Sequence, residues 1–174
     1  NGMPTGPWIV IVLSAIALFS SFFGTEKGLL KHYLRRWSNN LKIMQENTLK
    51  TFFYLTDEFN QQKLKVQQKA LFTHSRMANS TLKRGLFLIR MRGLAKKEGT
   101  DWYLTDDGEA ISKEIVRKHR LWELFISKYM HLKPDHVHDD AEGIEHVITP
   151  EIERELQEIL DFPTTDPHDN KIPY

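Results

Sequence analysis

The chain has 174 residues, of which 40% are hydrophobic and 27% charged, and its formal net charge is +1. It contains no cysteine, which excludes disulfide frameworks, zinc ribbons and thiol chemistry. The small net charge hides an asymmetry: residues 26–97 carry 16 Lys and Arg against 4 Asp and Glu, and residues 98–174 carry 8 against 19. The basic half indicates a polyanionic partner, and the acidic half, with most of the histidines, indicates cations. Two oppositely charged surfaces that pack on each other are the alternative.

The chain begins with an apolar segment that has no charged residue before Glu26. Residues 3–24 are long enough to cross a bilayer. Lys27, Lys31, Arg35 and Arg36 follow, and the positive-inside rule places such a flank in the cytoplasm. We therefore expect a transmembrane helix over residues 1–25, a membrane contact through residues 3–24 and a basic cytoplasmic linker over residues 26–40. A buried helix of a globular domain is the alternative.

Residues 41–112 have the order of elements of a winged helix-turn-helix domain. Apolar periodicity predicts helices over residues 41–60, 61–77 and 82–93, the third opened by the cap-forming run 78–81 and ended by Gly93. Apolar strands around a polar turn then predict a small β-hairpin wing over residues 94–108. In such domains the third helix enters the DNA major groove, so we expect DNA contacts from Ser80, Thr81, Lys83, Arg84 and Lys96. A winged helix that contacts only proteins is the alternative, favoured by the apolar run 85–88.

Residues 113–174 concentrate imidazoles and carboxylates at helical spacing. Expected helices over residues 112–130 and 135–148 bring groups three or four positions apart onto shared faces. The candidate metal ligands are His119, Glu123, His138, Glu142, Glu145 and His146. Nitrogen and oxygen donors alone suit Mn(II), Fe(II), Zn(II) or Ni(II). A solvated acidic helix is the alternative. EGIEH is not an HExxH motif, and no Ser nucleophile stands beside a His with an orienting acid, so we expect no enzyme.

Four segments, VRKHRLWELF, HDDAEGIEH, ITPEIERELQEIL and FPTTDPHDNKIP, resemble in order and spacing the metal-binding and dimerisation domain of the DtxR/MntR family of metal-activated transcriptional repressors. The resemblance runs from about residue 41 to the end. It implies a homodimer and two sets of metal ligands: His119, Glu123 and His138, and Glu142, Glu145 and His146.

The resemblance also indicates which metal is bound and where the chain departs from the family. Glu142 stands where iron-sensing members have Cys, and a harder ligand favours Mn(II), with Fe(II) next. The ligands that the family draws from the first winged-helix helix fall at Asn47 and Lys50. Asn47 is a weak ligand through its carbonyl oxygen, and Lys50 cannot bind metal while protonated.

The segment PTGPWIVIVLSAIALFSSFFGTEKGLL resembles the last transmembrane helix of metal-uptake ABC transporter permeases. This implies the C-terminal end of a permease in the inner (cytoplasmic) membrane, with residues 26–174 in the cytoplasm. An ABC transporter ATPase subunit is then an expected partner where the permease part is present. Cleavage within residues 38–45 would release a soluble fragment.

These observations predict a mainly α fold: one terminal transmembrane helix, a winged helix-turn-helix with a small wing over residues 41–112, and a helical metal-binding and dimerisation domain over residues 113–174. Two functions remain open. One is a metal-dependent (Mn/Fe) DNA-binding transcriptional regulator domain fused to a metal transporter permease. The other is a cytoplasmic metal-sensing dimerisation domain that regulates the transporter without binding DNA.

Overall fold

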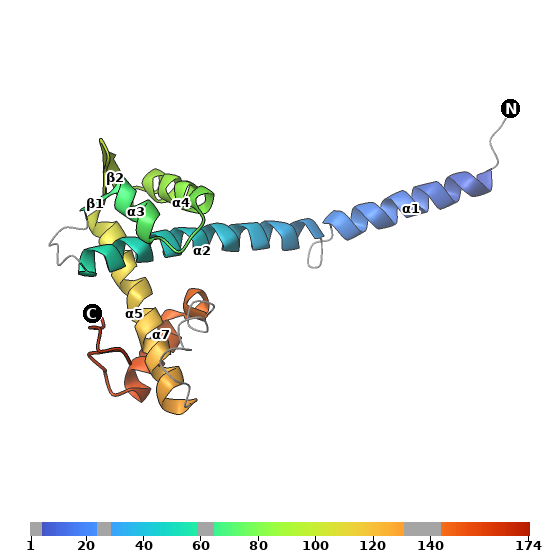
Figure 1. The fold of residues 1–174 in the computed structure, drawn as a ribbon. Helices are drawn as coiled ribbons and strands as arrows, with labels where there is room; N and C mark the ends of the chain where they lie inside the picture. The colour runs from blue at the N-terminus through green and yellow to red at the C-terminus, as the bar shows by residue number, and fades with distance from the viewer. Residues whose placement is uncertain (1–4, 24–28, 59–64, 131–143) are drawn as a thin grey trace. The chain divides into compact units, whose positions relative to one another are not determined.

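The computed structural model describes residues 5–23, 29–58, 65–130 and 144–174 (Figure 1). Two compact units divide the chain, Asn1–Lys42 and Ile43–Tyr174. The first unit holds α1 (Thr5–Phe23) and the beginning of α2 (Leu29–Glu58). The second holds the rest of α2 and, in order, β1 (Lys65–Gln67), α3 (Gln68–His74), α4 (Asn79–Met91), β2 (Ala95–Glu98), β3 (Asp101–Leu104), α5 (Asp106–Tyr129), the 3₁₀ helix η1 (Glu145–Val147) and α7 (Pro150–Ile159).

The terminal apolar segment requires a correction. Within the described part of the chain, no helix has the length and apolar character needed to cross a membrane. The predicted transmembrane helix at residues 1–25, with its membrane contact through residues 3–24, is therefore wrong. The fold that the structure supports is mainly helical with one small sheet.

The wing is a three-stranded antiparallel sheet with strand order β1-β3-β2, one strand more than the predicted hairpin. β2 and β3 pair around a tight turn in which Gly99 has a φ of +58°, a left-handed conformation that glycine adopts without strain. β1 pairs with β3 on the other side, with Val66 opposite Trp102. The second predicted helix, over residues 61–77, is therefore wrong at its beginning, because residues 65–67 are a strand and only Gln68–His74 form a helix.

The core of this part is built from one face of α2, one face of α4 and the sheet. Leu49, Phe52 and Leu55 recur at helical spacing on α2. They contact buried side chains from the elements that follow α2, namely Val66, Leu71, Leu82, Leu86, Ile89, Ala95, Trp102 and Ile115. The apolar face of α2 therefore fixes the position of α4 relative to the rest of the second unit.

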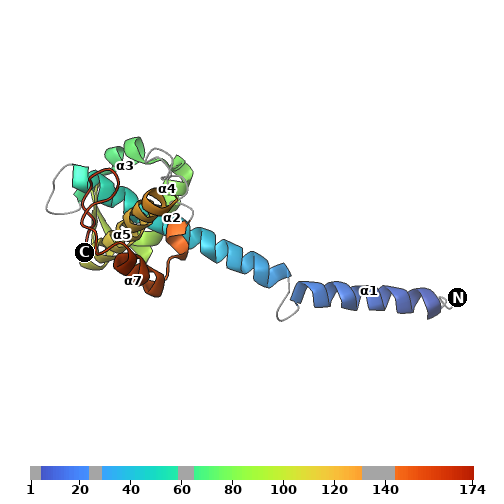
Figure 2. The same ribbon diagram turned by 90° about the horizontal axis from the view of Figure 1, so that it is seen from below.

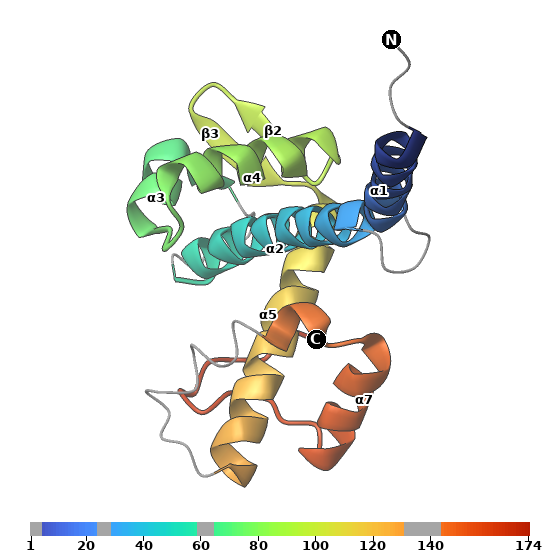
Figure 3. The same cartoon turned by 90° about the vertical axis from the view of Figure 1, so that its right-hand side faces the viewer.

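α5 connects this core to the C-terminal part of the chain (Figure 3). It begins at Asp106 rather than at residue 112, because the Thr105 hydroxyl caps it by accepting the backbone N–H of Gly108. Gly108 is required there, since a Cβ at that position would lie 2.0 Å from the Leu94 carbonyl oxygen. α7 packs against the far half of α5 (Figure 2) around a second cluster of Leu121, Leu160 and Ile172.

The helix predicted over residues 135–148 falls mostly on residues 131–143, which lie outside the described part of the chain. Its last turn is described, and Glu145–Val147 form a short 3₁₀ helix rather than an α-helix. Thr149 then caps α7, and Pro150 occupies the first helical position, where its missing N–H costs nothing. The backbone therefore changes direction between η1 and α7.

Candidate metal centre

α5 brings His119 and Glu123 together inside the protein. The two residues are four positions apart and therefore share a helix face. His119 Nε2 lies 3.0 Å from Glu123 Oε1, and the side chains are 4% and 1% exposed. A buried carboxylate is stable only where positive charge or hydrogen-bond donors compensate for its lost hydration. The imidazole of His119 can supply such a donor to Glu123, and a bound cation would supply such charge.

α2 faces this pair across a cavity of about 720 Å³. Asn47, His119 and Glu123 all line the cavity. Asn47 Oδ1 is buried and has no hydrogen-bond partner among the residues that the structure describes. Leaving a buried acceptor unsatisfied costs about 1–3 kcal/mol. The cavity therefore offers a buried oxygen donor at Asn47, the position that was predicted as a weak metal ligand.

Lys50 stands one helical turn beyond Asn47 and lines the same cavity. It is only 6% exposed. An ammonium group has three donors and no lone pair, so it cannot ligate a metal. It also brings a positive charge into the cavity that contains Glu123. A metal ion held by His119, Glu123 and Asn47 would share the cavity with this charge.

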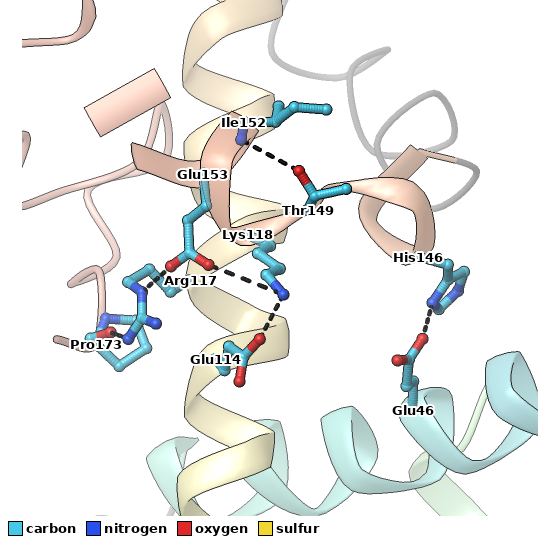
Figure 4. Close-up of polar contacts among 9 residues, drawn as sticks. All are labelled: Glu46, Glu114, Arg117, Lys118, His146, Thr149, Ile152, Glu153 and Pro173. Atoms are coloured by element: carbon cyan, nitrogen blue, oxygen red, sulfur yellow. Dashed lines mark hydrogen bonds and ion pairs between the residues drawn. The ribbon is translucent and has the colours of Figure 1, made fainter. Parts of the chain in front are cut away.

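A second contact joins α2 to η1 (Figure 4). His146 Nδ1 lies 2.6 Å from Glu46 Oε2, although the residues are 100 positions apart in the chain. Both side chains are largely buried, with 8% exposure for His146 and 19% for Glu46. Glu46 is not among the predicted site residues. The one signal was that Glu46 is the only carboxylate between Glu26 and Asp57, within the basic half of the chain.

The C-terminal segment is held against α5 beside the cavity. Arg120 Nε lies 3.6 Å from Asp166 Oδ2, and the Arg120 guanidinium also donates to the Lys171 carbonyl. Asp166 Oδ1 accepts the backbone N–H groups of His168 and Asn170 at 2.8 and 2.9 Å. The Asp166 carboxylate therefore organises the segment that closes this side of the protein.

A buried ion pair fixes α7 on α5 (Figure 4). Arg117 Nε lies 2.5 Å from Glu153 Oε1, and Arg117 Nη1 donates to the Pro173 carbonyl at 3.2 Å. Lys118 Nζ lies 3.8 Å from Glu153 Oε2 and also pairs with Glu114. These contacts hold α5, α7 and the chain end together one or two positions away from His119.

The predicted ligands fall into two groups. His119, Glu123 and Asn47 line one cavity, and His146 contacts Glu46 instead. His138 and Glu142 lie outside the described residues, and only the backbone of Glu145 is described. Within the described ranges, no three His, Asp or Glu side chains gather as a complete metal site. The nitrogen and oxygen donors that are present fit a first-row divalent metal.

α4 presents a polar and basic surface on the side opposite its buried face. Ser80, Lys83 and Arg84 are exposed, as is Lys96 on β2, and Thr81 is half-buried. The buried face consists of Leu82, Gly85, Leu86 and Ile89. Gly85 and Leu86 of the apolar run 85–88 are therefore buried, whereas Phe87 is 61% exposed, so protein contacts through this run stay a prediction.

The C-terminal part of the chain is similar to a domain of known repressors. Residues 105–174 match the family described as "Iron dependent repressor, metal binding and dimerisation domain". Over 70 residues the chain is 41% identical to the diphtheria toxin repressor of Corynebacterium efficiens, a match that covers 40% of this chain and 30% of that protein. The repressor homologues are regulators rather than enzymes, which confirms the expectation that the chain is not an enzyme.

A longer match extends over almost the whole chain. The chain is 31% identical over 177 residues to a probable metal transport system membrane protein of Chlamydia trachomatis serovar D, covering 98% of this chain and 38% of that protein. A probable metal transport system membrane protein of Chlamydia pneumoniae is 31% identical over 190 residues, covering 98% and 39%. The chain thus spans about two-fifths of the length of these relatives.

Solved structures show the same fold. A manganese-dependent transcriptional repressor in complex with manganese superimposes with a TM-score of 0.65 and 30% identity, covering 75% of this chain and 58% of that one. The manganese regulator SloR superimposes with a TM-score of 0.65 at 23% identity, covering 75% and 59%, a likeness of fold. None of these matches shows the predicted fusion to an ABC permease. The family, sequence and structure matches together show that residues 105–174 are similar to the metal-binding and dimerisation domain of iron-dependent repressors, and that the fold is similar to that of manganese-dependent repressors.

Proposed function

We propose that the chain is a DNA-binding transcriptional regulator domain controlled by Mn(II), with Fe(II) as the next candidate. The observation that carries the proposal is the double role of α2. Asn47 lines the cavity with His119 and Glu123, and the next residue, Thr48, packs directly against Gly85 of α4. A metal bound by Asn47 would therefore change the position of α2, and α2 packs directly against α4, the proposed DNA-reading helix.

The proposed metal ligands combine residues in the described cavity with residues outside the described part of the chain. His119, Glu123 and His138, with a weak contribution from Asn47, would form one set. Glu142, Glu145 and His146 would form the other. A bound divalent ion supplies the positive charge that compensates the buried carboxylates. The nitrogen and oxygen donors support Mn(II) or Fe(II), and the manganese-dependent repressor at 30% identity supports Mn(II) first.

The proposed DNA surface consists of the exposed N-terminal part of α4 and the wing. Ser80, Thr81, Lys83 and Arg84 lie in the first two turns of α4, where winged-helix domains reach base edges. Arg84 is the proposed guanine-reading residue, and Lys83 and Lys96 are proposed phosphate contacts. Homodimerisation would use apolar side chains that α5 and α7 leave exposed, among them Tyr129, Ile152 and Ile159.

A second candidate function is regulation of metal transport without DNA binding. Lys50 favours it, because a lysine at this position removes a ligand that would link the metal to α2. The two chlamydial relatives named as probable metal transport system membrane proteins also favour it. The same relatives support the proposal that the domain is fused to a metal-uptake permease in the whole protein.

The test is a Mn(II) titration of the full chain, with free Mn(II) followed by electron paramagnetic resonance. The variant is His119→Ala combined with Glu123→Gln, and the control is Glu114→Gln, an exposed carboxylate on the same helix. We expect saturable binding by the wild type and by the control, and weaker binding by the variant. Equal binding by all three proteins would exclude His119 and Glu123 as ligands.

DNA binding is then tested by fluorescence anisotropy with a labelled duplex of random sequence, with and without Mn(II), over a series of salt concentrations. Binding through several phosphate contacts weakens steeply with salt. A steep salt dependence that appears only with Mn(II) supports the regulator. Mn(II) binding without any DNA binding would favour the second candidate.

A further inference from the structure

Glu46 and His146 form a contact that the proposed ligand sets do not explain. His146 Nδ1 lies 2.6 Å from Glu46 Oε2, and this contact joins η1 to α2. Glu46 is the only acidic residue between Glu26 and Asp57, whereas six basic residues lie in residues 27–50. An isolated carboxylate in a basic segment, largely buried against an imidazole, indicates a specific role for that carboxylate.

The chemistry of the imidazole defines the role. A neutral imidazole has one N–H and one lone pair, on different ring nitrogens. When Nδ1–H of His146 donates to the Glu46 carboxylate, the lone pair is on Nε2. A carboxylate in this position fixes the tautomer and ring orientation of a metal-binding histidine and raises the basicity of its other nitrogen. We propose that Glu46 is the positioning residue that prepares His146 Nε2 for a divalent metal, an inference that rests on the proposed function.

The position of Glu46 gives this contact a second consequence. Glu46 precedes Thr48 by two residues, and a Cβ on Gly85 of α4 would meet both Thr48 Oγ1 and the Met44 carbonyl oxygen. If α2 moves or rotates at Glu46, Met44 and Thr48 move with it, and these residues form the surface that contacts α4. Lys50 cannot link α2 to a metal while it is protonated, and Asn47 is only a weak ligand, so the Glu46–His146 contact adds a link through the imidazole.

Three variants separate a positioning role from a ligand role. Glu46→Gln keeps an oxygen that accepts the Nδ1–H but removes the charge. Glu46→Ala removes the acceptor altogether. Asn40→Ala changes an exposed, uncharged residue earlier on α2 and is the control. Thermal unfolding of each metal-free protein shows whether the substitution leaves the fold intact.

The first measurement is NMR of the imidazole nitrogens in the metal-free full chain. We expect the His146 signals of a ring protonated on Nδ1 in the wild type, in Glu46→Gln and in Asn40→Ala, and loss of this tautomer preference in Glu46→Ala. The same tautomer in Glu46→Ala as in the wild type overturns the proposal, whatever the metal titration gives.

The second measurement is the Mn(II) titration by electron paramagnetic resonance, combined with hydrogen exchange of the α2 and α4 amides. Loss of a carboxylate that orients a metal-binding histidine weakens affinity by about 10–100-fold. We expect such a loss in Glu46→Ala, a smaller loss in Glu46→Gln, and Mn(II)-dependent protection of α2 and α4 only where affinity is retained.

The outcomes distinguish the two proposals. Wild-type affinity in Glu46→Ala would overturn the role of Glu46 and leave the metal-dependent regulator in place. An equal loss in Glu46→Gln and Glu46→Ala would make Glu46 a charged ligand and overturn the positioning role. Absence of Mn(II) binding by the wild type would overturn the regulator proposal and, with it, the role of Glu46 in metal binding.

Discussion

Gly85 of α4 lies so close to Thr48 of α2 that a Cβ at position 85 would stand 2.0 Å from Thr48 Oγ1. Thr48 is fixed there, because its hydroxyl donates to the Met44 carbonyl at 2.7 Å. The two helices can therefore approach each other only because residue 85 has no side chain. This contact joins the helix that lines the cavity to the helix with the proposed DNA surface.

Gly85→Ala should destabilise the fold by forcing α4 away from α2. Overpacking a close contact costs about 1–3 kcal/mol, measurable as a lower midpoint of urea unfolding. Phe87→Ala is the control, because Phe87 is on the same helix but 61% exposed, and surface substitutions stay within about 0.5 kcal/mol. Equal midpoints for Gly85→Ala and the wild type would show that α4 adjusts without cost.

Lys83→Ala and Arg84→Ala should weaken DNA binding in different ways. Loss of a phosphate contact at Lys83 should reduce the slope of log affinity against log salt by about 0.9. Loss of a bidentate guanine contact at Arg84 should cost about 1–3 kcal/mol and relax sequence preference. Selection of bound duplexes followed by anisotropy measures both effects. Lys113→Ala on α5 is the control, and an equal effect there would indicate non-specific attraction.

The fold could be predicted where local signals and packing agree. Gly93, with a φ of +73°, follows α4 as a helix-ending glycine is expected to do. The signals failed at residues 65–67, because Lys65 and Val66 gain their strand conformation from pairing with Tyr103 and Trp102, far along the chain. They failed again at Gly108, which was included in the predicted hairpin but lies in the first turn of α5, where its missing side chain leaves room for the Leu94 carbonyl.

The candidate site likewise combines one contact that the local sequence predicts with one that depends on residues far apart in the chain. The spacing of His119 and Glu123 predicted a shared helix face, and the structure brings the two side chains to 3.0 Å. The contact between Glu46 and His146 could not be predicted, because it depends on where η1 lies against α2, and no local pattern specifies that. Matching positions to the family selected Asn47 and Lys50 in preference to the neighbouring Glu46.

Lys50→Glu should raise the affinity of the cavity for Mn(II). The substitution removes a positive charge and adds a carboxylate opposite His119 and Glu123. We expect at least about a tenfold gain, which corresponds to about 1.4 kcal/mol, in the titration by electron paramagnetic resonance. The metal-free variant should be less stable than the wild type, because two buried carboxylates then face each other.

Lys50→Met is the matched control for this substitution. It removes the charge without adding a ligand, so its gain should be smaller than that of Lys50→Glu. If Lys50→Glu binds Mn(II) no better than the wild type, the metal does not enter the cavity lined by His119 and Glu123.

Glu153→Ala should detach α7 from α5. Breaking a fully buried ion pair costs about 3–5 kcal/mol, and we expect about 2 kcal/mol here because Arg117 is 21% exposed and partly solvated. Chemical unfolding measures the loss. Glu114→Ala, which removes an exposed partner of Lys118, should cost much less. A cost for Glu153→Ala no larger than for Glu114→Ala would show that apolar contacts alone hold α7.

Thr149→Ala should weaken the beginning of α7 and alter the titration of Glu151. The Thr149 side chain accepts the backbone N–H of Ile152 at 3.4 Å, and loss of such a cap costs about 1 kcal/mol. Hydrogen bonding from the Thr149 side chain also holds the pKa of Glu151 below its usual value. A carboxyl whose pKa is lowered in the folded state stabilises the protein above its unfolded pKa, and this contribution is lost as the pH falls through the folded pKa.

The stability difference between wild type and Thr149→Ala should therefore shrink in acid, as Glu151 becomes protonated in both proteins. NMR titration of the Glu151 side chain should show its pKa rising towards the usual value in Thr149→Ala. Thr149→Ser keeps the hydroxyl and should retain both the cap and the lowered pKa. If Glu151 titrates identically in Thr149→Ala and the wild type, the free backbone N–H groups at the start of α7 stabilise its carboxylate without help from Thr149.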